Sequence, residues 1–469
     1  MSSHEYNETA IIKNLKRYFL FFLIGFFMAC QSDDDQPSLE PSIHGFWLAA
    51  DKGYIIEFTD GKNVVYNINS VGCSVLDDDF KPEDFLNLQL DLVSPNELIG
   101  SSELMAADVK FVRLPNQNEF CLSDQISTTD DPKVNFDHFW NIFNDYYVFF
   151  ETRNVDWSQY KNLRDQVTTE NFYDTLEELV LLLEDGHVGI SDEANGIEIS
   201  SELPSLLARL NSDLSGDLII ESGEDYDKLY NQRIQTVVSK YLGGNFEIDE
   251  SENIAWGLVN NDIGYVNIFG MAGYGSNFKD ELTALNAVLD RVMTDIKISE
   301  VSKLILDIRF NGGGLDMVSV DIASRFMDQQ RIGFSKKARL GDGFTESTTI
   351  SVTPKGDFQF TGDIVLLTSP ITASAAEIFT LCLKDLSYVT IVGENTNGAF
   401  SDILEHVLPN GASVGLSNEV YSDAQGVVYE TIGVGPNEEN RIPLFSNSDY
   451  IEEKDSGIER AIELLSNNN

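Results

Sequence analysis

Basic residues are scarce in this chain. Lys and Arg together number 31, against 77 Asp and Glu, and the formal net charge is -46 at pH 7. A surface with that charge repels phosphates, so the composition argues against nucleic-acid binding. The acidic residues are spread along the chain, which is typical of a well-solvated surface and does not by itself indicate a substrate.

Histidine and cysteine are also few, with five and four residues in a chain of 469. The sequence has no His-Glu-x-x-His zinc motif and no Gly-x-x-x-x-Gly-Lys-Ser/Thr phosphate loop. No Rossmann glycine fingerprint follows a predicted strand. We therefore expect neither a metal nor an organic cofactor. The length predicts two or three domains.

The N-terminal region has no apolar run long enough to cross a bilayer comfortably. Its apolar stretch, residues 18–28, has only 11 residues and follows three basic ones: Lys13, Lys16 and Arg17. It ends in Phe27-Met-Ala-Cys30, which resembles the bacterial lipoprotein cleavage box. The resemblance implies a signal peptide at residues 1–29 and lipidation of Cys30.

Residues 30–42 resemble the acidic tethers that send lipoproteins to the outer cell surface. They begin Cys30-Gln-Ser-Asp-Asp-Asp-Gln36. We expect an exported protein that is lipid-anchored to the outer membrane, at the cell surface or facing the periplasm. The alternative is an uncleaved N-terminal anchor. Both interpretations place the body of the protein outside the cytoplasm.

Three cysteines remain beside Cys30. Cys73 and Cys121 fall within one predicted small domain. An exported protein can keep a disulfide, so we expect these two to form a pair. Cys382 has apolar neighbours on a predicted helix, and we expect it to be a buried packing residue.

The chain divides into regions with different apolar patterns. Short apolar runs alternate with turn signals over residues 43–125, which predicts a small β barrel or sandwich. After a linker, residues 133–195 have helical spacing, with an aromatic stripe that we expect to be core: Phe136, Phe139, Trp140, Phe143, Tyr146 and Tyr147. Residues 196–469 alternate strands and helices, which predicts an α/β (α+β) core with a mixed, partly parallel sheet.

One serine stands at the junction of a predicted strand and helix. Ser374 follows the apolar run 364–367 and precedes residues 375–386, which have helical spacing. A hydroxyl there lies near free backbone N–H groups and the positive end of a helix dipole, which stabilises the oxyanion of acyl transfer. The competing interpretation is that Thr372 or Ser374 simply caps the helix.

A glycine run, Asn311-Gly-Gly-Gly314, ends another predicted strand. Sites in open α/β sheets form at the carboxyl ends of strands, and glycines let backbone N–H groups approach a ligand. If the two strands are near neighbours, the N–H groups of Gly313 or Gly314 and of Ala375 form an oxyanion hole beside Ser374. The alternative is that the run is only a turn.

A serine nucleophile needs a base. His187 follows Asp185-Gly186 at a helix end, a loop position from which side chains face clefts, and it is the best placed of the five histidines. The nearest lysine in sequence, Lys384, lies about 15 Å from Ser374 along the predicted helix, which is too far.

Four motifs in this order resemble the tail-specific, or C-terminal-processing, serine peptidases. They are Asp307-Ile-Arg-Phe-Asn-Gly-Gly-Gly314, Thr372-Ala-Ser-Ala-Ala-Glu377, Gly393-Glu-Asn-Thr-Asn-Gly398 and Gly433-Val-Gly-Pro436. The resemblance covers about residues 135–442 and implies a ClpP/crotonase-like core with Ser374 as the nucleophile. The best-known members have a Lys base at the position that Ala399 occupies here.

The chain instead resembles the tricorn-type branch of that family, which uses a His base. This resemblance implies that His187 is the base and that Glu430 orients or polarises it through an intervening polar residue. The branch often has Ser before the His, where this chain has Gly186. Residues 190–260 are short for the peptide-binding PDZ module of many relatives and lack its carboxylate loop, so recognition of free C-termini is not implied.

The resemblance implies a cell-envelope serine endopeptidase that hydrolyses peptides or unfolded proteins through an acyl-enzyme on Ser374. Two alternatives stay open. One is a catalytically inactive peptide- or lipid-binding protein on the same fold, as in the retinoid-binding proteins of the vertebrate eye. The other is a surface interaction protein whose small β domain is the working part.

Overall fold

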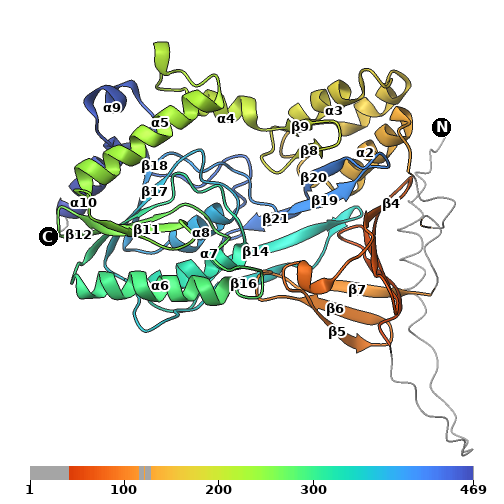
Figure 1. Cartoon of the computed structure of the whole chain (residues 1–469), viewed down its shortest axis with the longest axis horizontal. Coiled ribbons are helices and arrows are strands. Elements are labelled where there is room, and N and C mark those ends of the chain that lie inside the picture. Colours follow the sequence, from red (N-terminus) through yellow and green to blue (C-terminus); the bar gives the residue numbers. More distant parts are fainter. Residues whose placement is uncertain (1–41, 116–120, 122–127, 468–469) are drawn as a thin grey trace, which may run out of the picture.

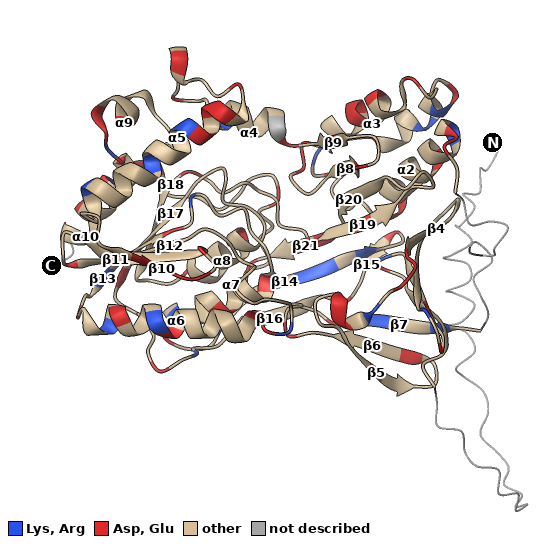
Figure 2. Ribbon diagram, in the orientation of Figure 1, with Lys and Arg blue, Asp and Glu red and all other residues tan. Residues whose placement is uncertain are grey.

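The computed structural model describes residues 42–115, 121 and 128–467 (Figure 1). The predicted signal peptide, the lipidation site Cys30 and nearly all of the acidic tether lie outside these residues. Within them, no helix is long and apolar enough to cross a membrane. Acidic residues are spread over the described chain rather than gathered on one element (Figure 2).

Six strands form the central sheet, in the order β10-β11-β12-β13-β17-β18. The pairs β12–β13, β13–β17 and β17–β18 are parallel and the pairs β10–β11 and β11–β12 are antiparallel, so the predicted mixed, partly parallel sheet is confirmed. Their bounds are Phe246–Ile248, Ile254–Val259, Ile263–Ile268, Lys303–Asp307, Asp363–Thr368 and Val389–Gly393.

Helices cover both faces of this sheet, which is why its parallel strands read as continuous apolar runs. Leu304 and Leu306 of β13 pack on the side of three helices: α6 (Glu281–Ile298), α7 (Asp316–Ala323) and α8 (Ala375–Leu383). Ile305, between them, packs on the other side with α10 (Ser456–Asn467). This alternation with period two fixes the register of the buried strands.

Two four-stranded sheets flank the central one. The first pairs β14 (Arg331–Leu340) with β15 (Gly343–Phe344), β16 (Thr348–Val352) and β21 (Glu419–Ser422). The second has the order β19-β20-β8-β9, with bounds Ile403–Val407, Ser413–Ser417, Gly189–Asp192 and Ile197–Ser200.

The helical part packs against this second sheet. It consists of α2 (Pro132–Tyr146), the 3-10 helix η3 (Trp157–Asp165) and α3 (Phe172–Leu181). The aromatic stripe on and just after α2 is buried in one cluster with β20, as the sequence predicted for a core face.

The N-terminal β domain is one seven-stranded antiparallel sheet in the order β4-β3-β2-β1-β7-β6-β5. The bounds of β1 to β7 are Gly45–Ala49, Tyr54–Phe58, Val64–Asn69, Gly72–Asp77, Gln89–Ser94, Glu97–Ser101 and Val109–Leu114, with a 3-10 helix η1 (Pro82–Asp84) between β4 and β5. In the described residues the outer strands β4 and β5 do not pair with each other. Cys73 and Cys121 form a disulfide across 48 residues of sequence.

The β domain is anchored to the rest of the chain on more than one side. Leu104 is buried in the main core cluster. On the other side, the hydroxyl of Tyr54 donates to the Glu405 carbonyl at 2.7 Å, and the ammonium of Lys52 lies 2.6 Å from the Glu419 carboxylate. The domain therefore sits firmly on the core, beside β16 in Figure 1.

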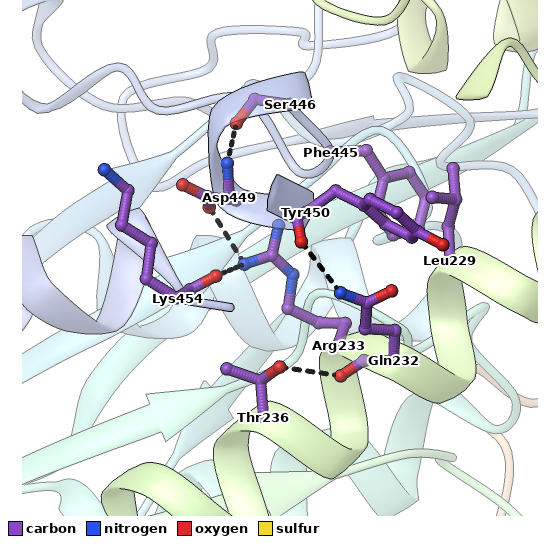
Figure 3. A pocket seen from close by; sticks show the side chains of 9 residues that line it. All are labelled: Leu229, Gln232, Arg233, Thr236, Phe445, Ser446, Asp449, Tyr450 and Lys454. Atoms are coloured by element: carbon purple, nitrogen blue, oxygen red, sulfur yellow. Dashed lines mark hydrogen bonds and ion pairs between the residues drawn. The ribbon is translucent and has the colours of Figure 1, made fainter. Parts of the chain in front are cut away.

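Helices α4 (Leu203–Leu210), α5 (Gly223–Thr236) and α9 (Asn447–Glu452) complete the fold. A cavity of about 20 Å³ lies between α5 and α9 (Figure 3). Arg233 crosses it and donates to Asp449 at 2.9 Å and to the carbonyls of Leu444 and Lys454 at 2.7 and 3.1 Å. Because the guanidinium is held by these acceptors, we interpret Arg233 as a structural link between the two helices and not the cavity as a binding site.

Candidate active site

Ser374 lies where β17 turns into α8, with its side chain partly exposed. Its φ is 55°, a left-handed conformation that costs a non-glycine residue about 1–3 kcal/mol. An ordinary N-cap residue has extended backbone angles. The strain at Ser374 therefore favours the nucleophile interpretation over the simple cap.

Glu377 holds the Ser374 backbone in this conformation. Its buried carboxylate accepts from the N–H of Ser374 at 3.2 Å, and from the N–H groups of Gly398 and Ala399 at 2.7 and 2.8 Å. The hydroxyl of Thr396 donates to it at 2.6 Å. Burial raises the pKa of Glu377 to about 8, although all four donors oppose the rise. No role was predicted for Glu377 from the sequence, although an acid inside an otherwise apolar helix is a signal of one.

The glycine run lies directly against the serine. A Cβ on Gly313, whose φ is 106°, would stand 2.6 Å from Cβ of Ser374, so only glycine fits there. The N–H of Gly313, however, donates to Oδ1 of Asn311 at 2.9 Å and is not free to bind an oxyanion. Asn311 also donates to the Ile268 carbonyl at 3.0 Å, which ties the turn to the end of β12.

Two of the expected oxyanion donors remain unpaired. In the described structure the N–H groups of Ala375 and Gly314 donate no hydrogen bond. Ala375 opens α8, and its nitrogen is 3.0 Å from the position of a Cβ on Gly313. Of the predicted oxyanion donors, Ala375 and Gly314 therefore keep a free N–H, and that of Gly313 is taken by Asn311.

His187 stands in the turn between α3 and β8 and is 8% exposed. Ala399 lies between this turn and Ser374. If Gly186 carried a Cβ, that atom would lie 3.3 Å from Cβ of Ala399. The Ala399 carbonyl in turn accepts from the N–H of Ser374 at 3.1 Å. Among the described residues the imidazole makes no hydrogen bond, either to the Ser374 hydroxyl or elsewhere, and its Nδ1 is buried. Burial lowers the pKa of His187 below 6.5, which keeps the ring neutral at pH 7.

Glu430 is linked to this turn but makes no hydrogen bond or ion pair with His187. One oxygen lies 2.5 Å from the guanidinium of Arg153, and the other accepts from the N–H of Phe400 at 3.0 Å. Arg153 is also 3.5 Å from Asp185, whose carboxylate accepts from the N–H of His187 at 2.9 Å. The link from Glu430 to His187 thus runs through Arg153 and Asp185. Arg153 has no sequence signal, because its role depends on tertiary placement.

Gly186 marks the place of the serine in tricorn-type sequences, and Glu202 fills the space beside it. A Cβ on Gly186 would lie 2.9 Å from Oε2 of Glu202. The other oxygen of Glu202 accepts from the side-chain amide of Asn397. Burial raises the pKa of Glu202. A carboxylate from the start of α4 therefore stands where the resemblance led us to look for a hydroxyl.

The described residues contain no cluster of His, Cys, Asp and Glu side chains that could hold a metal ion. Cys382 is buried on α8, and burial raises the pKa of its thiol to about 12, as suits a packing residue.

Comparison with known proteins identifies the α/β region. Residues 262–440 match the model of Peptidase family S41, so this region is similar to the serine peptidases of that family. The carboxyl-terminal-processing protease of Synechocystis is 29% identical over 163 residues, which cover 34% of this chain and 36% of that protein. The chloroplastic C-terminal processing peptidase of Tetradesmus obliquus is 28% identical over 185 residues, 38% of this chain and 35% of the relative. The chain thus spans about a third of the length of these curated relatives.

Solved structures resemble the chain more widely, at the level of the fold. A suspected peptidase from Parabacteroides merdae has a TM-score of 0.58 at 24% identity and covers 72% of this chain and 97% of its own. Mature CPAF has a TM-score of 0.50 at 13% identity, over 71% of this chain and 96% of its own. The mixed α/β architecture is therefore shared with both.

Proposed function

We propose that this chain, whose residues 262–440 match the model of Peptidase family S41, is a serine endopeptidase with Ser374 as its nucleophile. The observation that carries the proposal is the strained Ser374 at the start of α8, beside the unpaired N–H of Ala375. An observed backbone outlier of this kind is typical of functional sites.

In the proposed reaction, Oγ of Ser374 attacks the carbonyl carbon of a peptide bond while His187 takes the hydroxyl proton. The carbonyl oxygen becomes an oxyanion, which the N–H groups of Ala375 and Gly314 stabilise. Each such donor is worth about 3 kcal/mol of barrier. When the C–N bond breaks, His187 returns the proton to the leaving amine. Water then hydrolyses the acyl-enzyme and restores the serine.

The proposed base works as part of a positioned turn. Asp185 holds the backbone of His187, and Arg153 holds Asp185 and Glu430 together. The imidazole and the serine hydroxyl do not yet share a hydrogen bond, and catalytic hydrogen bonds are often long in a free enzyme and tighten when substrate binds. We assign Arg153, Asp185 and Glu430 as positioning residues.

The surroundings of the site suit an extended, unfolded polypeptide. The segment 427–432 runs beside the nucleophile loop, where the N–H of Thr431 donates to the Gly398 carbonyl at 2.8 Å. It exposes Val427 and Ile432, by 46% and 62%. Exposed apolar side chains that lie close together can mark a surface that binds another polypeptide. The direct test is hydrolysis of unfolded casein by residues 31–469, with and without Ser374→Ala.

We expect kcat/KM to rise with pH along a limb whose midpoint lies below 6.5. Burial lowers the pKa of His187, with Asp185 and Asp402 opposing it, so the ring is already deprotonated near neutral pH. The pH dependence of kcat/KM reports the pKa of the base in the free enzyme. The measurement is kcat/KM from pH 4.5 to 8.5, with each sample reassayed at pH 7 to exclude unfolding. A limb centred above pH 7 would contradict the assignment of His187.

We further propose that the protein is exported and anchored by lipid on Cys30. The disulfide between Cys73 and Cys121 supports an oxidising compartment. In a bacterial host the wild type should incorporate labelled palmitate and sediment with membranes, whereas Cys30→Ala should do neither. Cys382→Ala, a change of the same kind at a buried site, should behave as wild type. Palmitate labelling that survives Cys30→Ala would exclude this anchor.

One observation favours binding without catalysis as the second candidate. The hydroxyl of Ser374 and the ring of His187 share no hydrogen bond in the described structure, as a peptide- or lipid-binding relative would allow. A fluorophosphonate probe separates the two functions, because it labels an activated serine and leaves an unactivated one intact.

A further inference from the structure

We propose that a hollow between the β domain and the oxyanion turn (residues 311–314) is a subsite for a Lys or Arg side chain of the polypeptide substrate. The proposal rests on the proposed peptidase function and names the substrate feature that the β domain recognises.

The hollow has a volume of about 580 Å³, within the range of small-ligand sites and larger than one side chain needs. Its two walls come from distant parts of the sequence. The β domain contributes Glu83 and Asp84 of η1 and the nearby Asn87. The core contributes a wall that includes Ala272, Phe278 and Leu315.

The core wall is the outer side of the proposed oxyanion hole. Leu315 directly follows Gly314, and its N–H donates to the Met271 carbonyl at 2.8 Å. The backbone of Ala272 packs so closely on Gly314 that a Cβ there would lie 3.0 Å from the Ala272 nitrogen. A polypeptide whose scissile carbonyl reaches Gly314 therefore lies next to Leu315, which lines this hollow.

The chemistry of the walls selects a long cationic side chain. Phe278 is 41% exposed and, with Leu315 and Ala272, offers apolar surface to an aliphatic stem. At the rim, neither Glu83 nor Asp84 has an ion-pair partner among the described residues, so both carboxylates are free to meet an ammonium or guanidinium group.

The other charged groups of the hollow do not cancel this preference. Glu281 accepts from the N–H groups of Tyr274 and Gly275 at 3.1 and 2.8 Å and so holds the core wall in shape. Lys279 is the one basic residue of the lining, against two free acids. Charge complementarity at such a rim sets specificity more than affinity.

The experiment scans one lysine through a neutral fluorogenic peptide and compares kcat/KM with the neutral parent and with a glutamate scan. At one position the lysine peptide should be cleaved several-fold faster than the parent, and the glutamate peptide more slowly. In Glu83→Gln/Asp84→Asn the lysine advantage should fall roughly three- to tenfold, while the neutral peptide keeps its rate. The advantage should also shrink in 1 M NaCl.

The matched control is Asp78→Asn/Asp91→Asn, which removes the same charge from exposed positions of the same domain. This control should leave the lysine advantage unchanged; an equal loss in both double variants would mean general attraction and overturn the subsite. Phe278→Ala should reduce the lysine advantage without changing the charge.

Failure of the subsite and failure of the peptidase function give different results. Hydrolysis with no lysine preference at any position overturns the subsite alone. If no peptide is cleaved, the peptidase proposal fails, and fluorescence anisotropy of the labelled lysine peptide tests the hollow separately. Equal binding of that peptide to wild type and Glu83→Gln/Asp84→Asn then overturns the subsite as well.

Discussion

Replacing Ser374 with Ala is expected to lower kcat on unfolded casein by about six orders of magnitude, to the background set by binding alone. The reason is that the proposed acyl-enzyme forms only on this hydroxyl, and the base and oxyanion donors act as one unit with it. The variant should still fold, because the alanine adopts the same strained backbone that Glu377 holds through the N–H of residue 374. Casein cleavage measured over days, beside the thermal unfolding midpoint, checks both statements.

Ser222→Ala is the matched control for this change. Ser222 caps α5, where its hydroxyl accepts from the N–H of Asp225 at 3.3 Å. Losing such a cap costs about 1 kcal/mol of stability and should leave hydrolysis intact. If Ser374→Ala behaves like Ser222→Ala, with a small loss of stability and full activity, then Ser374 is only a helix cap and the peptidase proposal is wrong.

The parts of the site that sequence could predict are those set by short stretches of chain. Ser374 and the glycine run each follow an apolar strand, so their place at the carboxyl edge of a parallel sheet follows from the pattern itself. The strands β13 and β17 are hydrogen-bonded neighbours, which brings the two turns together as expected. His187 could be selected because histidine is rare here and its turn follows a clear helix.

What sequence could not predict depends on contacts between distant segments. The expectation that Gly313 donates to an oxyanion overlooked Asn311, whose side chain folds back two residues and takes that N–H. Glu430 was expected to act on His187 through an intervening polar residue, but the sequence did not show that Arg153, a cation 277 residues away, binds its carboxylate. No periodicity or spacing in the sequence indicates that Arg153 forms an ion pair with Glu430, because each residue lies in a loop whose path the rest of the fold determines.

Removing that cation is expected to have the largest effect on stability. Arg153 is 6% exposed and lies between two buried carboxylates, Asp185 and Glu430, which are 0% and 1% exposed. Arg153→Met leaves both without their counter-charge, and breaking a buried pair in this way costs about 3–5 kcal/mol. Urea unfolding at pH 8 should show a loss of this size, and hydrolysis should fall with it because Asp185 holds the His187 turn.

The loss should be smaller at pH 5 than at pH 8, because Glu430 can then be protonated. Burial, and after it the charge of Asp185, raises the pKa of Glu430 from 4.5 to about 8 in the folded protein, even with Arg153 opposing. A carboxyl with a raised folded pKa stabilises the fold below its unfolded pKa and loses that contribution as pH rises toward 8.

Two further variants show whether the orphaned charge is the cause. Adding Glu430→Gln to Arg153→Met should restore part of the stability above pH 8, where a Glu430 carboxyl without its counter-charge would otherwise have to ionise. Arg164→Met breaks an ion pair with Asp137 that is 42% and 32% exposed, and should cost at most about 1 kcal/mol at either pH. If Arg153→Met costs no more than Arg164→Met, the buried network does not hold the His187 turn, and the positioning roles assigned to Glu430 and Asp185 fall with it.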